Sequence, residues 1–123
     1  MHTYVLKEVQ AHPFYKQHQK FIVEVYKKTG EKLDPSNLVP QLIELESFKS
    51  ELKWHLMVAK AMQDKAYADA WSTKSTVHGA SKRNEREADA EVMVYTALRN
   101  IFEYASENID EKINLGKKLL GSV

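Results

Sequence analysis

The stretch 71–86 holds the residue types that are best suited to binding a charged ligand. It combines an aromatic side chain, Trp71, with several small hydroxyl residues and four cations. The four cations are Lys74, Lys82, Arg83 and Arg86. Cationic side chains neutralise phosphates, hydroxyl groups and backbone amides can position them, and an aromatic ring can stack on a base. The pattern indicates a nucleic-acid site, and the alternative is a solvated loop that Trp71 anchors in the core.

Outside this stretch the sequence contains no pattern typical of catalysis or of metal binding. No pair of its five histidines has the i,i+4 spacing of a helical metal site. No serine lies in a nucleophile elbow, and the glycines do not form a phosphate-binding loop. Four acidic residues fall mostly off the apolar stripe, which favours a solvated face: Glu103, Glu107, Asp110 and Glu111. We therefore expect a protein without catalytic activity, metal, cofactor or small-molecule substrate.

Two long segments flank the stretch, and in each of them apolar residues recur at gaps of three and four. These gaps place the apolar residues on one face of a helix, so we predict helices over about 40–71 and about 82–120. Each helix would be roughly 45–50 Å long. Alanine is frequent near the loop end of both segments, which predicts close approach of the two helices there. The predicted fold is all-α, a long antiparallel helical hairpin.

A shorter helix is predicted before the hairpin, over about 13–29, with Gly30 as its C-terminal stop. The segment 34–37, Asp-Pro-Ser-Asn, indicates a turn with one helical turn starting at Pro35. A helix of about 17 residues spans roughly 25 Å, half the length of the hairpin, and cannot cover both apolar faces. We therefore expect a helical bundle that forms a homo-oligomer by coiled-coil packing or binds a partner along the hairpin. The alternative is that the long helices kink and fold back. The predicted interface residues are Trp54, Leu98, Phe102 and Ile109.

Length and composition indicate a single helical domain over residues 1–123. Apolar residues make up 43% and charged residues 28%, which is typical of a folded chain rather than a disordered one. The chain has no cysteine, no apolar run that could span a membrane and no signal-peptide pattern, so we expect a cytoplasmic protein. The net charge of +1 is unevenly distributed. Residues 72–86 carry four cations and one acid, a net of +3, whereas residues 87–112 carry seven acids and two cations, a net of −5.

The later part of the chain, YADAWSTKST followed by SKRNEREADAEVMVYTALRNIFEYASENIDEKINLGKKL, resembles a family of small helical phage proteins. The family is that of the UvsY recombination mediators of T-even-like phages and cyanophages, and the resemblance covers about residues 42–120. It implies a short helical protein that assembles into rings, binds single-stranded DNA and helps to load a recombinase past single-strand binding protein. The DNA-contacting residues that it implies are Lys65, Lys74, Lys82, Arg83 and Arg86.

Two hypotheses for the function result from these observations. In the first, an accessory protein of phage DNA recombination or replication binds single-stranded DNA as an oligomer through basic hairpin tips. A ring of tips would neutralise many more phosphates than one tip. In the second, a helical protein-interaction module binds or inhibits a host protein, or is a subunit of a larger complex. Substitutions of apolar residues would abolish the second activity, and substitutions of the loop cations would abolish the first.

Overall fold

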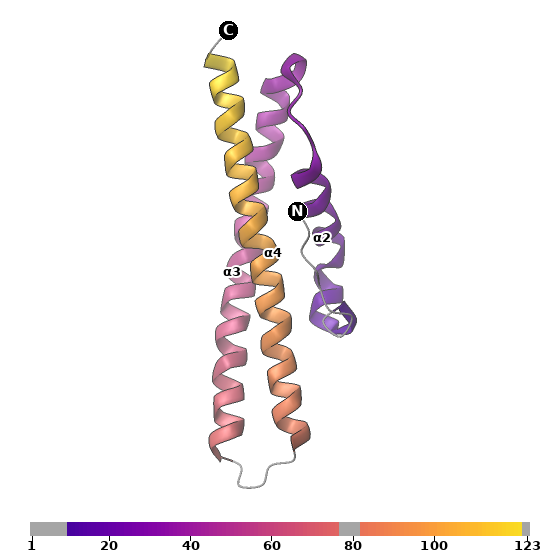
Figure 1. Cartoon of the computed structure of the whole chain (residues 1–123), viewed down its shortest axis with the longest axis vertical. Coiled ribbons are helices and arrows are strands. Elements are labelled where there is room, and N and C mark those ends of the chain that lie inside the picture. The colour runs from indigo at the N-terminus through magenta and orange to yellow at the C-terminus, as the bar shows by residue number, and fades with distance from the viewer. Residues whose placement is uncertain (1–9, 77–81, 122–123) are drawn as a thin grey trace.

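The computed structural model shows an all-α fold dominated by one antiparallel hairpin of two long helices (Figure 1). It describes residues 10–76 and 82–121, and the side chains between residues 72 and 88 lie outside the description. The elements are α2 (Pro13–Gly30), the 3-10 helix η1 (Pro35–Asn37), α3 (Leu38–Thr76) and α4 (Lys82–Gly121). No strand occurs in the described part of the chain. The predicted fold class and the three predicted helices are confirmed.

The ends of α2 follow from its sequence. The Phe14 backbone N–H donates a hydrogen bond to Nδ1 of His12 at 3.2 Å, and Pro13 stands in the first turn, where no backbone N–H is needed. At the other end, the backbone N–H of Glu31 donates to the Lys27 carbonyl at 3.1 Å. These bonds satisfy backbone groups that have no partner inside the helix.

The predicted turn around Pro35 is present and connects α2 with α3. The side chain of Asp34 accepts a hydrogen bond from the Ser36 backbone N–H at 3.0 Å, which is typical of an Asx turn. Gln41, in the first turns of α3, accepts from the Asp34 N–H and donates to the Lys32 carbonyl, both at 2.8 Å. The connection is therefore fixed to the start of α3 by side-chain hydrogen bonds.

The facing sides of α3 and α4 form the core, and their side chains change in size along the hairpin. α3 buries leucines and a phenylalanine toward its beginning and alanines toward its end, as the sequence predicted. The buried residues of α3 include Leu38, Leu42, Leu45, Phe48, Leu52, Ala59, Ala66 and Ala70. Those of α4 include Val94, Tyr95, Leu98, Ile101, Phe102, Ala105, Ile109 and Ile113. Small side chains let the two backbones approach closely, whereas the larger ones fill the wider part of the fold.

A polar network crosses the hairpin at Gln63, whose side chain is buried between α3 and α4. Gln63 donates to Thr96 Oγ1 at 2.8 Å and accepts from Arg99 Nη1 at 2.7 Å. Arg99 also donates to Glu103 through Nε at 2.9 Å. A buried amide without hydrogen-bond partners is costly, so these bonds favour one register of the two helices over others.

Acidic residues of α4 pair with lysines of α3. The Nζ of Lys49 lies 2.6 Å from a carboxylate oxygen of Asp110, and the Nζ of Lys60 lies 3.8 Å from Glu103. Two of the four acidic residues that the sequence assigned to a solvated face therefore take part in contacts across the hairpin. They contribute mainly to the relative placement of the helices, because such partly exposed pairs add only about 0–1 kcal/mol to stability.

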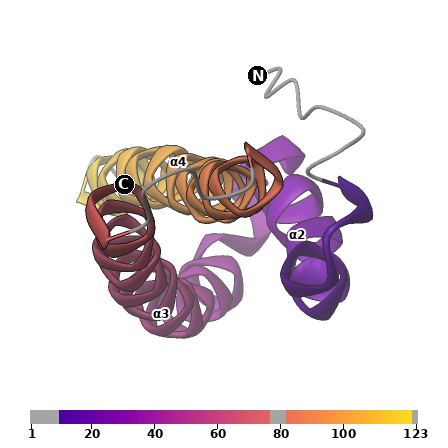
Figure 2. The ribbon, with the colours of Figure 1, turned by 90° about the horizontal axis from the view of Figure 1, so that it is seen from below.

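The short helix α2 packs beside the hairpin and runs parallel to α4 (Figures 1 and 2). Near its start, the ring of Phe14 makes an edge contact with Tyr95, at 4.5 Å between centroids. Near its end, the backbone carbonyl of Lys28 accepts a hydrogen bond from Lys112 at 2.9 Å. Most of the length of α2 therefore runs beside α4. The helix covers the part of the core that contains the larger side chains.

The structure corrects the expectation that part of the core stripe stays exposed. Leu98, Phe102 and Ile109 were predicted at an interface, but each is 0% exposed and packs within the chain. They cannot contact a partner in this fold, because the two long helices bury their apolar stripes against each other. Trp54 differs from them, since 64% of its surface is exposed. The exposed large apolar residues of α3 lie on sides of the helix other than the one that carries its core stripe.

Candidate interaction surfaces

A second row of apolar residues lies on the side of α3 that is not buried against α4 and α2. We define the outer stripe as Val39, Ile43, Trp54, Met57 and Trp71. Every member is exposed, from 54% for Val39 to 74% for Trp71. α3 is therefore apolar on two opposite faces, whereas α2 and α4 concentrate their apolar residues on one.

Small, exposed side chains occupy the gaps of the outer stripe. These residues are Ser47, Ser50, Ala61 and Ala68. Together with the apolar members and the exposed Asp64, they recur every three or four positions, which is the spacing of a helix–helix seam. The seam covers residues 39–71, roughly 48 Å of helix. A row of this length is large for the exposed apolar surface of a monomer and is typical of an interface.

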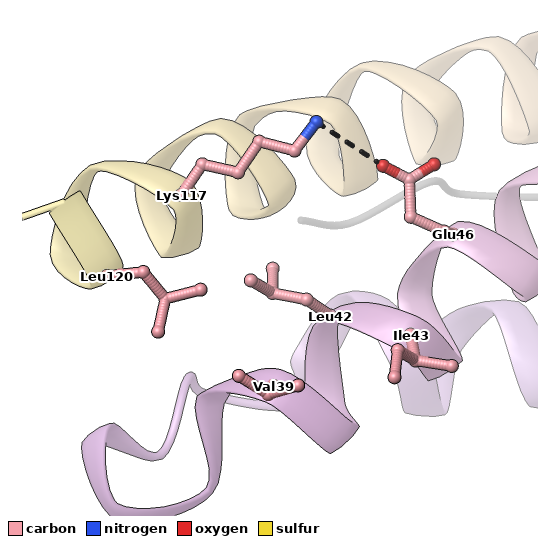
Figure 3. Close-up of a pocket in the computed structure, with 6 residues that line it drawn as sticks. All are labelled: Val39, Leu42, Ile43, Glu46, Lys117 and Leu120. Carbon is pink, nitrogen blue, oxygen red and sulfur yellow. Dashed lines mark ion pairs between the residues drawn. The ribbon is translucent and has the colours of Figure 1, made fainter.

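An apolar groove lies at the beginning of the outer stripe, where α3 starts beside the end of α4 (Figure 3). Its volume is about 270 Å³, and it is lined by Val39, Leu42, Ile43, Glu46, Lys117 and Leu120. The Nζ of Lys117 lies 3.6 Å from a carboxylate oxygen of Glu46 across the groove (Figure 3). The groove therefore combines apolar walls with one ion pair, a combination that suits a bulky apolar side chain.

The cations of the stretch 71–86 are carried by the two helix ends that meet at one end of the hairpin (Figure 1). One belongs to the end of α3 and three to the start of α4: Lys74, Lys82, Arg83 and Arg86. Their side chains lie outside the described residues, so their role in DNA binding stays a prediction. Trp71 is largely exposed, so it does not anchor this region in the core.

Lys65, the fifth predicted DNA contact, is exposed on α3 in different surroundings. It lines a recess together with Asp69, Glu91 and Tyr95. Two carboxylates beside an ammonium group lower the positive potential at that point. Lys65 is therefore less suited to binding phosphate than a cation without acidic neighbours.

An aromatic cluster connects α2 with the hairpin. The ring of Phe21 stacks on His55 of α3 at 3.7 Å between centroids, and His55 lies 5.8 Å from Phe102 of α4. Next to them, the Nδ1 atoms of His18 and His55 are 3.1 Å apart, which is a hydrogen bond between two imidazoles. One ring must donate and the other must accept, so Nδ1 of the accepting ring carries no proton.

Burial in this cluster lowers the pKa of both histidines. For His18, the nearby charge of His55 lowers the pKa further. For His55, the carboxylate of Glu51 acts in the opposite direction but is the smaller of the two influences. Burial therefore favours the neutral form of both rings, which keeps a nitrogen without a proton available as the hydrogen-bond acceptor.

Sequence reasoning missed this histidine pair because its members are 37 positions apart and share no local motif. The available signal was their placement on the apolar sides of two predicted helices. The pair does not amount to a metal site, since no group of three or more metal-ligating side chains occurs in the described residues.

Lys112 of α4 binds the C-terminal end of α2. Its Nζ donates to the backbone carbonyls of Lys28 at 2.9 Å and Thr29 at 2.7 Å, and also to that of Glu31. Carbonyls at a helix C-terminus lack partners inside the helix and carry partial negative charge, so an ammonium group is favourable there. Burial nevertheless lowers the pKa of Lys112, although the Glu31 carboxylate partly compensates.

Comparisons of the chain with family models, with curated proteins and with solved structures gave no match. The resemblance to recombination mediators therefore stays a prediction. No helix in the described part of the chain is long and apolar enough to cross a membrane.

Proposed function

We propose that this protein acts without catalysis as a self-associating helical module, and that the outer stripe of α3 is its interface. The observation that carries this proposal is the row of five exposed apolar residues on the side of α3 opposite the core. Fully burying one large apolar side chain is worth about 1.5–3 kcal/mol, so three or four such residues can supply enough energy for stable association. The groove at the start of α3 extends the same surface.

Light scattering coupled to size exclusion tests self-association. The wild-type chain is expected to elute as a defined oligomer, and Trp54→Ser with Met57→Ser is expected to give the monomer mass. The matched control is Met93→Ser with Tyr104→Ser, which removes two exposed apolar residues from α4. The control should keep the wild-type mass. A wild-type monomer at high concentration would contradict the proposal.

Binding of single-stranded DNA at the hairpin tip is a second candidate function. It is favoured by the placement of four cations on the two helix ends that meet there. An oligomer would present several tips, and log Kd rises with log salt in proportion to the number of phosphates neutralised. Recombinase loading is the cellular role that the resemblance implies for such binding.

Fluorescence anisotropy with a labelled single-stranded oligonucleotide at several salt concentrations tests the second candidate. Lys82→Glu with Arg83→Glu is expected to abolish binding. Lys32→Glu with Lys118→Glu makes the same change in net charge near the opposite end of the hairpin and should reduce binding only slightly. Equal losses in the two variants would mean that binding depends on total charge and not on the tip.

A further inference from the structure

The outer stripe and the residues in its gaps form a seam, and the order of side-chain sizes along this seam is nearly symmetric about the middle of α3. Large residues stand at both ends and at the centre, and small residues lie between them. The order is Val39, Ile43, Ser47, Ser50, Trp54, Met57, Ala61, Asp64, Ala68, Trp71, with Asp64 as its one charged member. A symmetric order suits a two-fold interface, in which the same surface of two copies meets itself.

Antiparallel pairing matches this order layer by layer. With the two-fold axis between residues 55 and 56, positions whose numbers add to about 111 lie opposite each other along the seam. Trp54 then meets Met57 of the second copy, and Ser50 meets Ala61. Near each end, Ile43 lies opposite the small side chain of Ala68. The large side chains pack at the centre, small or polar side chains follow on both sides of it, and Trp71 reaches the start of the second α3 at each end.

Charge distinguishes the antiparallel from the parallel arrangement. Asp64 is exposed within the seam, between Ala61 and Ala68. In a parallel pair it would face its own copy, and two like charges at one layer are destabilising. In the antiparallel pair it lies opposite Ser47. Antiparallel helices also bring opposite ends of their dipoles together.

The position of the groove on α3 also favours the antiparallel pair. Trp71 and Glu46 are 25 positions apart, close to seven full turns, so Trp71 lies on the same flank of α3 as the groove. In an antiparallel two-fold pair, a given side of α3 lies next to the same side of α3 in the second copy. In a parallel pair, it lies next to the opposite side. Trp71 would lie opposite position 40 of the second copy, which is next to Val39 and Ile43 of its groove.

We propose that two copies of this chain pair through antiparallel α3 helices and that Trp71 of each copy occupies the groove of the other. The inference rests on the proposed self-association and adds its geometry. The two basic tips then lie at opposite ends of the dimer, separated by roughly the 58 Å length of a 39-residue helix.

Single cysteines test the arrangement in a chain that contains none of its own. The antiparallel pair predicts that Ser50→Cys and Ala61→Cys cross-link with each other in a mixture under mild oxidation, and that neither variant cross-links with itself. A parallel pair predicts the reverse, since each cysteine would then meet its own copy. Self-linking of both single variants would overturn the inference and leave self-association intact.

A distance measurement avoids the strict geometry of a disulfide. A spin label on Ala68→Cys should lie about 37 Å along the axis from its mate in the antiparallel pair, and within about 10 Å sideways in the parallel pair. A single short distance would overturn the antiparallel arrangement. A monomer without any dipolar coupling would overturn both this inference and the proposed function.

The groove contact has its own test. Trp71→Ser is expected to raise the dimer Kd about tenfold or more, since a buried tryptophan is a frequent hot spot. Leu120→Ser, which removes a groove wall, should also weaken the dimer, and the double variant should lose less than the sum. Strict additivity of the two changes would show that Trp71 does not enter the groove.

Discussion

The two faces of α3 contain similar residue types and have different surroundings. On the inner face, leucines and alanines pack against α4, and Phe48 contacts α2 through Phe21. On the outer face, none of the elements that the structure describes covers Trp54 or Met57, and each is 64% exposed. Apolar character alone therefore does not define the core of this protein. Burial depends on which face the neighbouring helices cover.

The largest expected difference between the faces is in stability. Leu52→Ala on the inner face should lower the free energy of unfolding by about 2–5 kcal/mol, because it leaves a cavity at a fully buried site. Met57→Ala on the outer face should change it by about 0.5 kcal/mol or less. Urea unfolding at low protein concentration, where association contributes least, measures both. Similar losses in the two variants would mean that the outer face is covered within the monomer.

The contact of α2 with α4 allows a second comparison, between Lys112 and a lysine without this role. Lys112→Met should destabilise the docking of α2 by about 1–3 kcal/mol, since three backbone carbonyls lose their shared donor. Hydrogen exchange of the α2 amides would report the loss. Lys118→Met, in the exposed last turn of α4, is the control and should leave exchange in α2 unchanged. Unchanged exchange in both variants would contradict the role of Lys112.

A substitution at Gly116 tests how tightly the inner face is packed where the start of α3 lies beside the end of α4. A Cβ at this position would lie 2.5 Å from Cδ2 of Leu42, so one of the two must move. Gly116→Ala should destabilise by about 1 kcal/mol, because the strain of overpacking exceeds the gain in helix propensity. Thermal unfolding of Gly116→Ala and of Gly121→Ala measures the difference, since nothing lies within 4 Å of the added Cβ at Gly121. A more stable Gly116→Ala variant would show that Leu42 moves at little cost.

The smallest expected effect concerns pH and the histidine pair. The folded state lowers the pKa of His18 and His55, so the unfolded state binds more protons below its own histidine pKa of about 6.5. Stability should therefore be full above pH 6.5 and fall as the pH decreases through the lowered values. The unfolding free energy at pH 7.5 and 5.5 should differ less in His18→Gln with His55→Gln than in the wild type. An identical difference would show that the pair does not couple folding to pH.

The repeats of three and four residues determined the secondary structure and the hairpin, because amphipathic periodicity and helix-end signals act over a few residues. They also predicted which stripes of α3 and α4 become the core. Tertiary structure alone decided which surface remains open. Leu98 and Phe102 look as suitable for an interface as Trp54 does, but the position of α4 against α3 buries them. The approach of His18 to His55 likewise depends on where α2 docks, because no local sequence signal relates residues that lie 37 positions apart.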